Sequence, residues 1–516
     1  MRSTFMGLEA SKRGLFVQQS ALYTTGHNIS NANTLGYSRQ RVNMQATPGY
    51  PYPGLNSPTY PGHLGTGVEA GSIQRIRDQF IDRQYRQETN KLGYWESTTQ
   101  SISQMEDIMT EPSEFGINQA FTDFWKSMED VIDNPKDTAG RQVMISKGQA
   151  LAEAFNYMDT QLKLIQGNIG NEINVSTEKV NSILKQIAAI NKQILAVEPN
   201  GYVPNDLYDA RDLLVDELNE YIPVSISMVE SGGLAKDVAE GSMTIKFKPF
   251  EGGPEITLVD GKNYATLATT DTNGAPIDGD VDDQTTNGFA EFGAINVSDL
   301  GDPPADALTN AVATIDYNTL EPSKGKLLSL VDAYGHSGGE GLYPEMLKKL
   351  DVLVNDFITA FNEQHKKGFD LDGAPGVDFF SGTSARDIKV EITDPKQIAA
   401  SGAAGEEGNN ENIRLLAQLH SDTRPNLQNG TFQTYYKSLT GELAVKGQEA
   451  IRNAYNSGTL HLQIANSRAS MSSVSLDEEM TNMITFQQAY NANARMITVV
   501  DEILEKIING MGRVGL

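Results

Sequence analysis

The chain has 516 residues, 39% of them hydrophobic, and a formal net charge of −26. That length suggests several domains rather than one core, and the acidity argues against nucleic acid as the main partner, because phosphate binding needs a basic surface. Cysteine is absent, which excludes disulfides and thiolate metal sites, and there is no apolar run of about 18 residues that would predict a membrane-spanning helix.

The first predicted helix carries an apolar residue at every seventh position, the repeat of a seam between supercoiled helices. An ordinary amphipathic helix packed on its own domain is the alternative. A turn should end this helix, because asparagine and glycine tolerate left-handed backbone and asparagine bonds to neighbouring main chain. The seam residues are Leu8, Leu15, Leu22 and Ile29, and the turn residues are Asn28, Asn31, Asn33, Gly36 and Tyr37.

Residues 47–67 contain five prolines and are predicted to form an extended linker or a long surface loop. From residue 73 onward, apolar residues recur at helical spacing for about 150 residues. Within this stretch the expected helices cover 117–132, 141–166, 180–194 and 204–222.

The apolar period changes to two at residue 223, which predicts half-buried strands. Turn signals separate several such strands up to about residue 323. Residues 230–323 hold 17 Asp or Glu against 4 Lys, which most simply indicates a solvated surface. Helical patterns return at 342–365, a short strand is expected at 388–392, and helix resumes from about residue 412.

A second apolar stripe runs along the last predicted helix with an average step of about 3.5 residues, again the period of a helix seam. We expect the two chain ends to pair, so that the rest of the chain is attached to a stalk of two helices. The stripe consists of Leu476, Met480, Met483, Phe486, Tyr490, Ala494, Ile497, Val500, Leu504, Ile507 and Met511.

The predicted fold is therefore mainly α with an inserted β domain. Paired coiled-coil helices are expected at 1–40 and 475–516, and an elongated helical bundle at 41–228 and 324–474. An outer β-rich domain is expected at 229–323.

Residues that would indicate catalysis are not grouped in this sequence. The six histidines lie far apart, and no phosphate-binding, dinucleotide-binding or hydrolase motif is present. We predict no catalytic, cofactor-binding or metal-binding residue. Two aspartate-rich turns resemble the start of a calcium loop but lack its closing glutamate, so Asx turns are the simpler interpretation. They comprise Asp271, Asn273, Gly274, Asp278 and Asp280, and Asp370, Asp372, Gly373 and Asp378.

Both chain ends resemble signatures of the bacterial flagellar axial proteins, the family of rod, hook and hook-associated proteins. Residues 20–42 (SALYTTGHNISNANTLGYSRQRV) are similar to the N-terminal signature, and residues 475–509 are similar to the C-terminal one. Segments 65–86, 111–131 and 204–218 resemble the hook-associated members more closely than rod or hook proteins. The resemblance covers nearly the whole chain except about 230–323.

The resemblance implies a structural adaptor between hook and filament, assembled head to tail in a helical lattice. The stripe and turn residues would then form subunit contacts, and the two terminal stripes would be disordered in the free protein. Implied partners are other copies of the chain, the hook protein, the next hook-associated protein and an export chaperone that binds the C-terminal region. The chain would be exported to the flagellum outside the cell through the type III apparatus, without a cleaved signal. Another axial protein, hook or distal rod, and an enzyme carried in the outer domain are the alternatives.

Overall fold

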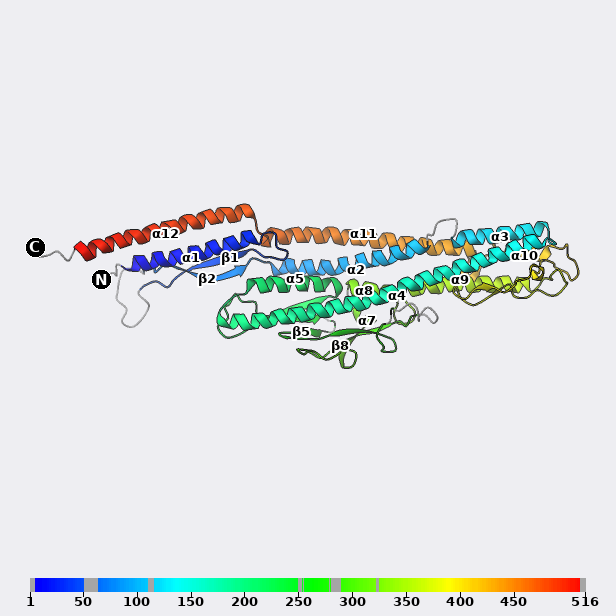
Figure 1. Cartoon of the computed structure of the whole chain (residues 1–516), viewed down its shortest axis with the longest axis horizontal. Helices are drawn as coiled ribbons and strands as arrows, with labels where there is room; N and C mark the ends of the chain where they lie inside the picture. The colour runs from blue at the N-terminus through cyan, green and yellow to red at the C-terminus, as the bar shows by residue number, and fades with distance from the viewer. Residues whose placement is uncertain are drawn as a thin grey trace, which may run out of the picture.

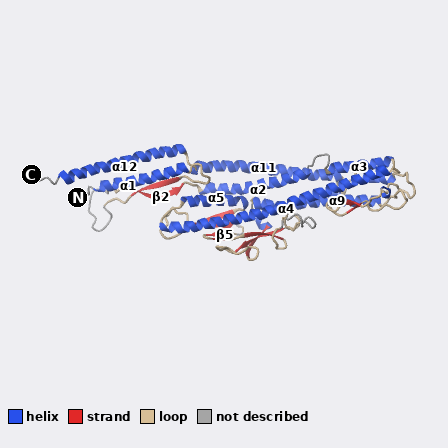
Figure 2. Cartoon of the chain, in the orientation of Figure 1, coloured by secondary structure: helices blue, strands red, loops and turns tan. Residues whose placement is uncertain are grey.

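The computed structural model describes residues 5–50, 64–109, 116–248, 253, 255–277, 279, 289–321 and 324–510. The molecule is a long rod of helices, with a slender extension at one end and strands along one side (Figures 1 and 2). The predicted fold class is confirmed.

The slender extension, here called the stalk, is built from both chain ends. Helix α1 (Phe5–Ser30) lies beside α12 (Leu476–Gly510), as expected for the two stripes. Strands β1 (Gln40–Ala46) and β2 (Val68–Arg75) form an antiparallel pair that packs on α1. This pair was not predicted, and it shows that residue 73 belongs to a strand rather than to a helix. Residues 51–63 of the proline-rich segment lie outside the described residues.

The rod consists mainly of helices, and the bounds of α3, α5 and α9 follow the predicted segments closely. The helix expected from about residue 412 is divided into α10 and α11. Helix α11 lies along α2, and α3 and α4 form a second close pair. The rod helices are α2 (Gln79–Met109), α3 (Ile117–Asp133), α4 (Thr138–Val197), α5 (Asn205–Tyr221), α7 (Tyr317–Leu320), α8 (Lys326–Tyr334), α9 (Leu342–His365), α10 (Glu411–Gln418) and α11 (Phe432–Ser472). Single 3-10 turns cover Glu198–Asn200, Pro395–Gln397 and Pro425–Leu427.

Helix α4 is one continuous helix of 60 residues, so the separate helices expected at 141–166 and 180–194 are a wrong division. Asp137 caps its start by accepting hydrogen bonds from the backbone N–H groups of Ala139 and Gly140. A Cβ atom on Gly170 would lie 2.9 Å from the ring of Tyr334. This glycine therefore allows close approach of α8 and does not end the helix.

The strands form two antiparallel sheets that share the hydrophobic core of the rod. One sheet has the order β3-β4-β5-β6, and the other has the order β7-β8-β9. Their bounds are β3 (Val224–Val229), β4 (Ser242–Phe247), β5 (Ile256–Asp260), β6 (Asn263–Tyr264), β7 (Leu267–Asp271), β8 (Phe292–Ser298) and β9 (Ala311–Asp316). A separate antiparallel pair joins β10 (Phe380–Ser381) to β11 (Lys389–Val390), close to the strand expected at 388–392.

Asparagines on one side of α4 attach the two sheets to the helix. Asn181 donates to the carbonyl of Leu267 at 2.8 Å and accepts from its N–H at 2.7 Å. Asn191 makes the same pair of bonds with Met243, at 2.8 and 3.1 Å. These bonds satisfy backbone N–H and C=O groups of the strands. They hold the two sheets along α4 (Figure 1). The outer domain boundary at 229–323 stays a prediction, although the first strand already begins at Val224.

We expect Asn191→Ala to destabilise the protein by about 2–3 kcal/mol, because the fully buried amide also bonds Gly261 and Arg211 and its loss leaves several buried groups unpaired. Urea unfolding followed by circular dichroism measures the change. Asn168→Ala, at an exposed position of the same helix, is the matched control and should change stability by less than about 0.5 kcal/mol. Equal effects of the two substitutions would contradict this role for Asn191.

Candidate functional site: the stalk and its joint with the rod

The seam between α1 and α12 is closest where α1 carries small side chains. The buried residues of α1 are Gly14, Val17, Ala21, Thr24, Thr25 and Asn28. A Cβ atom on Gly14 would lie 2.8 Å from the side chain of Asn493 on α12. The predicted seam residues Leu8, Leu15, Leu22 and Ile29 are only half-buried. The seven-residue repeat therefore located the helix but not its most buried face.

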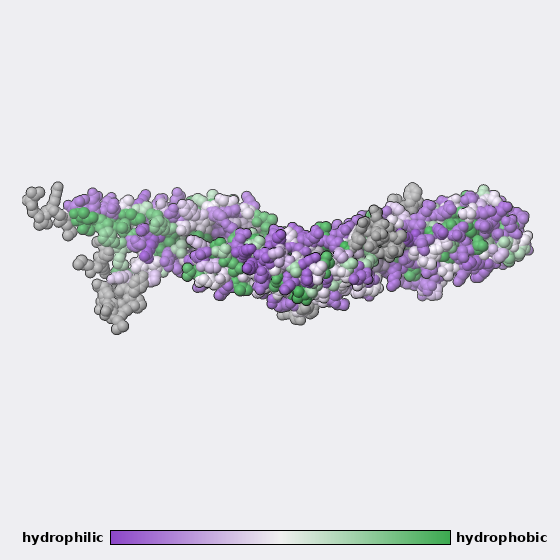
Figure 3. All heavy atoms as spheres, turned by 60° about the horizontal axis from the view of Figure 1, so that its bottom comes forward, coloured by the Kyte–Doolittle hydropathy of each residue, from purple (hydrophilic) through white to green (hydrophobic). Residues whose placement is uncertain are grey.

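Helix α12 presents apolar side chains on more than one face. Seven predicted stripe residues are half-buried against α1, namely Met483, Phe486, Tyr490, Ala494, Ile497, Val500 and Leu504. Leu476, Met480 and Ile507 are exposed instead, and Met511 lies outside the described residues. Further apolar residues that the stripe missed are also exposed, namely Ile484, Met496, Val499, Ile503 and Ile508. Apolar surface gathers visibly on this end of the molecule (Figure 3).

The predicted turn after α1 is the point where the chain ends meet. The Asn28 amide donates to the Gln40 carbonyl at 2.9 Å and to the Glu479 carboxylate at 3.0 Å. Its oxygen accepts from the Tyr37 hydroxyl at 2.8 Å. Burial, followed by the charges of nearby carboxylates, raises the Tyr37 pKa well above its usual value, so this hydroxyl stays a donor.

The other predicted turn residues have smaller structural roles. Asn31 is half-buried, while Asn33 is exposed. Gly36 has a positive φ of 79° and lies against the Leu213 side chain, so a larger residue would be strained there. The sequence thus predicted a turn after α1, but Asn28 lies in the last turn of α1 itself and makes the central contact from there.

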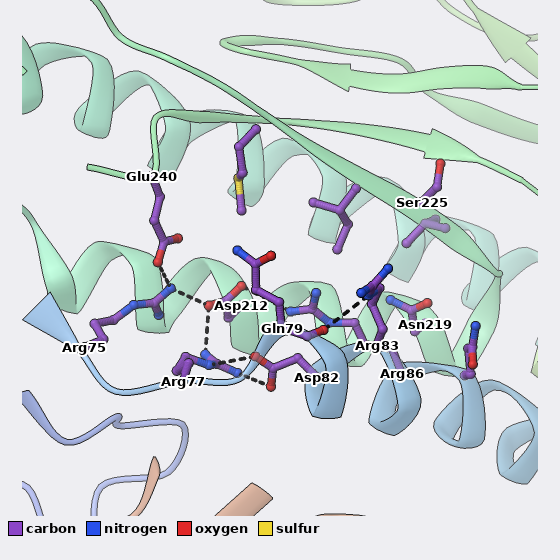
Figure 4. A pocket seen from close by; sticks show the side chains of 14 residues that line it. Arg75, Arg77, Gln79, Asp82, Arg83, Arg86, Asp212, Asn219, Ser225 and Glu240 are labelled. Atoms are coloured by element: carbon purple, nitrogen blue, oxygen red, sulfur yellow. Dashed lines mark hydrogen bonds and ion pairs between the residues drawn. The ribbon is translucent and has the colours of Figure 1, made fainter. Parts of the chain in front are cut away.

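A cluster of arginines and carboxylates joins the stalk to the rod (Figure 4). Arg75, at the end of β2, contacts Asp209 at 2.7 Å and Asp212 at 2.8 Å. Arg77 contacts the same Asp212 at 2.8 Å. Arg468 of α11 contacts Asp82 of α2 at 2.6 Å and Asp216 of α5 at 2.7 Å. One ionic network therefore connects β2, α2, α5 and α11.

Asp212 lies at the centre of this cluster. Burial alone would raise its pKa, but the guanidinium groups around it outweigh that effect and hold the pKa well below its usual range. Those groups belong to Arg77, Arg75, Arg86 and Arg211. A groove of about 580 Å³ runs beside the cluster, between α2 and β3.

Sequence reasoning missed this cluster because acidic side chains of a helix are ordinarily expected to face solvent. Asp209, Asp212 and Asp216 are buried instead, whereas Leu213 is exposed. The spacing of three and four residues between these acids was the available signal, because it places them on one helix face.

The described residues give little indication of a ligand site. No three acidic or histidine side chains among them gather into a group that could hold a metal ion. Asp271 and Asp370 each accept two backbone N–H groups of their own turn, which is the Asx geometry. Asp278 and Asp280 lie outside the described residues. None of the helices in these ranges is both long and apolar enough to cross a membrane.

Two flagellar family models match this chain. The model of the "Flagellar hook-associated protein FlgK helical domain" matches residues 102–380, and that of the "Flagellar basal body rod FlgEFG protein C-terminal" matches residues 465–510. Flagellar hook-associated protein 1 of Bacillus subtilis is 40% identical over 99% of both chains, and that of Escherichia coli is 24% identical over 96% of this chain and 98% of its own. The solved structure of the flagellar hook junction protein FlgK from Burkholderia pseudomallei has a TM-score of 0.61 at 14% identity, covering 76% of this chain and all of that one.

These matches show that the chain is a structural component of the bacterial flagellum. Within that class, the chain belongs to the flagellar hook-associated protein 1 (FlgK) family. The resemblance seen in the two end signatures is thereby confirmed.

Asp212→Asn should destabilise the joint by about 3 kcal/mol at neutral pH, because it removes the shared partner of several buried guanidinium groups. The folded-state pKa of Asp212 is depressed, so its stabilising effect is full above the ordinary value of 3.8 and is lost as the pH falls below it. Urea midpoints measured from pH 7 to pH 3 should therefore fall more steeply for the unsubstituted protein than for the variant.

The control is Asp302→Asn, which breaks an exposed ion pair with Lys192 and should cost less than about 1 kcal/mol. Parallel pH curves for the Asp212 variant and the unsubstituted protein would contradict the assignment.

Proposed function

We propose that this chain is the structural adaptor that joins the flagellar hook to the filament, through head-to-tail helical assembly of its subunits. The terminal helices α1 and α12 supply the inner contacts between copies, and the outer face of α11 continues them onto the rod. The chain acts by assembly and not by catalysis. The name of the Burkholderia relative, a hook junction protein, supports the position in the flagellum.

The observation that carries this proposal is a long surface almost free of carboxylates. The chain contains 67 Asp and Glu residues, yet between Ala450 and Val500 the only ones are Asp477, Glu478 and Glu479, at the joint of α11 and α12. Depletion of charge together with exposed aromatic and aliphatic residues is typical of the centre of a protein interface. The exposed apolar residues of this surface are Ile451, Tyr455, Leu460, Leu462, Met471, Leu476, Met480, Ile484, Met496 and Val499.

The proposed partners follow from the position in the flagellum. Other copies of the chain lie beside it, the hook protein lies on one side and the next hook-associated protein on the other. The protein lies outside the cell, reached through the type III apparatus without cleavage of a signal. A dedicated export chaperone covers the C-terminal helix before assembly, because its exposed apolar face would otherwise promote association.

The hook protein itself is the second candidate, since a flagellar hook protein of Borreliella burgdorferi is 21% identical over 98% of this chain. The match of the hook-associated helical domain to residues 102–380 favours the junction role. An enzyme in the β layer is disfavoured, because the groove next to it is lined by side chains already engaged in ion pairs.

Val499→Glu combined with Ile503→Glu should abolish filament attachment while leaving hooks intact, because it places two carboxylates on the exposed apolar face of α12. Electron microscopy of cells carrying the variant counts hooks with and without filaments. Lys262→Glu, at an exposed position in the turn between β5 and β6 and outside this surface, is the control and should leave attachment normal. Immunoblots of the medium separate failed assembly from failed export, and normal filaments on the double variant would contradict the proposal.

In the free protein we expect proteases to trim both stalk helices quickly, because a two-helix seam without its neighbours is marginally stable. A fragment of roughly residues 70–470 should resist digestion. Mass spectrometry of the time course identifies the ends. Termini as resistant as the middle would argue that the stalk is complete before assembly.

A further inference from the structure

Head-to-tail association needs two different, complementary surfaces on each copy. The outer face of α11 supplies one of them. Exposed apolar residues also form a straight stripe on a second rod helix, α4. They are Val143, Tyr157, Leu164 and Val175, with exposed fractions of 45%, 53%, 39% and 64%. We infer that this stripe, here called the α4 stripe, is the surface that receives α11 of a neighbouring copy of the chain. This inference rests on the proposed function.

The α4 stripe has the spacing of a helix-packing seam. Val143, Ala150, Tyr157 and Leu164 follow one another at intervals of seven residues, and all are exposed. A seven-residue repeat of exposed apolar side chains is a surface along which a helix of a second copy can pack. The buried residues of α4, such as Phe155, Met158 and Leu162, already supply its contacts within the rod.

The surface around the α4 stripe is hollowed in a way that suits a helix. A depression of about 270 Å³ lies between α2 and α4, next to Tyr157. Gln104, Asp107, Ile108, Gln161 and Ile165 line it together with Tyr157. Asp107 is the one charged residue of this lining and is itself exposed to solvent, so apolar side chains inserted beside Tyr157 and the two isoleucines would displace water at little electrostatic cost.

The outer face of α11 matches the α4 stripe in spacing and in charge. Tyr455 and Leu462 are seven residues apart, as are Tyr157 and Leu164. Arg452 precedes Tyr455, and Glu153 precedes Tyr157, by three and four residues respectively. Each is exposed and forms no ion pair with any residue in the described ranges. When the two tyrosines are aligned, the free cation of one copy lies beside the free carboxylate of the other.

The direction of the helices allows this alignment. Helices α4 and α11 both run from the far end of the rod toward the stalk (Figure 1). In a head-to-tail assembly all rods point the same way. Helix α11 of one copy and α4 of the next are therefore parallel, so that the two seven-residue repeats and the charged residues that precede the tyrosines run in the same direction.

Disulfide cross-linking in isolated flagella tests the contact directly, because the chain has no cysteine of its own. A chain carrying both Leu164→Cys and Leu462→Cys should give a ladder of linked subunits on non-reducing gels, since the aligned positions would lie within disulfide reach. Chains with either cysteine alone should give no ladder. Val352→Cys with Leu415→Cys, at exposed positions on α9 and α10, is the control pair and should not link.

If the paired cysteines prevent assembly, a charge pair decides the question. Leu164→Glu alone and Leu462→Lys alone should each lower the fraction of hooks bearing filaments about tenfold, a change of about 1.4 kcal/mol. The double variant should restore it, because the two charges then face each other. A junction that forms without a ladder, or single variants that the second change does not rescue, would overturn the inference. The proposed function would fail separately, through normal filaments on cells carrying Val499→Glu with Ile503→Glu.

Discussion

The position of the stalk depends on one joint, where main chain from both ends of the sequence meets the base of the rod. The buried bond between Asn28 and Glu479 connects residues that are 451 positions apart. Around it, Ser38 donates its backbone N–H to Asp209, and Arg39 donates its own to the carbonyl of Ser472. Both ends of the chain are thus held at a single place, and α1, α12 and the β1–β2 pair extend from it as the stalk.

This joint is held mainly by charged and polar groups, which follows from its shape. A slender stalk has little apolar surface to bury where it meets a rod. Directional hydrogen bonds and ion pairs therefore fix the orientation of the stalk on the rod. The cost of burying charge is offset because each guanidinium of Arg75, Arg77 and Arg468 meets at least one carboxylate at close range. Such a cluster contributes a defined geometry more than net stability. Exposed apolar residues on α11, α12 and α4 form the surfaces where other subunits are proposed to bind.

Local sequence patterns, namely apolar periodicity and helix-ending residues, predicted much of the fold. The helix expected at 342–365 has those bounds in the structure, and Asn134 with Pro135 ends α3 as predicted. Patterns failed where a residue serves a contact that only tertiary structure creates. Gly170 fits the approach of Tyr334 and therefore lies inside a helix, and the asparagines of α4 bind strands that lie far along the chain. The β1–β2 pair was not predicted because its side chains are largely polar or exposed. Its sequence therefore lacks a clear alternation of apolar and polar residues.

The sequence by itself determined that both chain ends are helices with apolar stripes, that a β layer interrupts a helical chain, and that the ends carry flagellar signatures. These follow from periodicity and local motifs, which depend on neighbours within a few residues. Only the tertiary structure decided which face of each helix is covered. It placed Gly14 and Asn28 in the seam, turned Asp212 inward, and left Val499 and Tyr157 exposed. Burial is set by what lies opposite a side chain in space, and the spacing of residues along one helix does not contain that information.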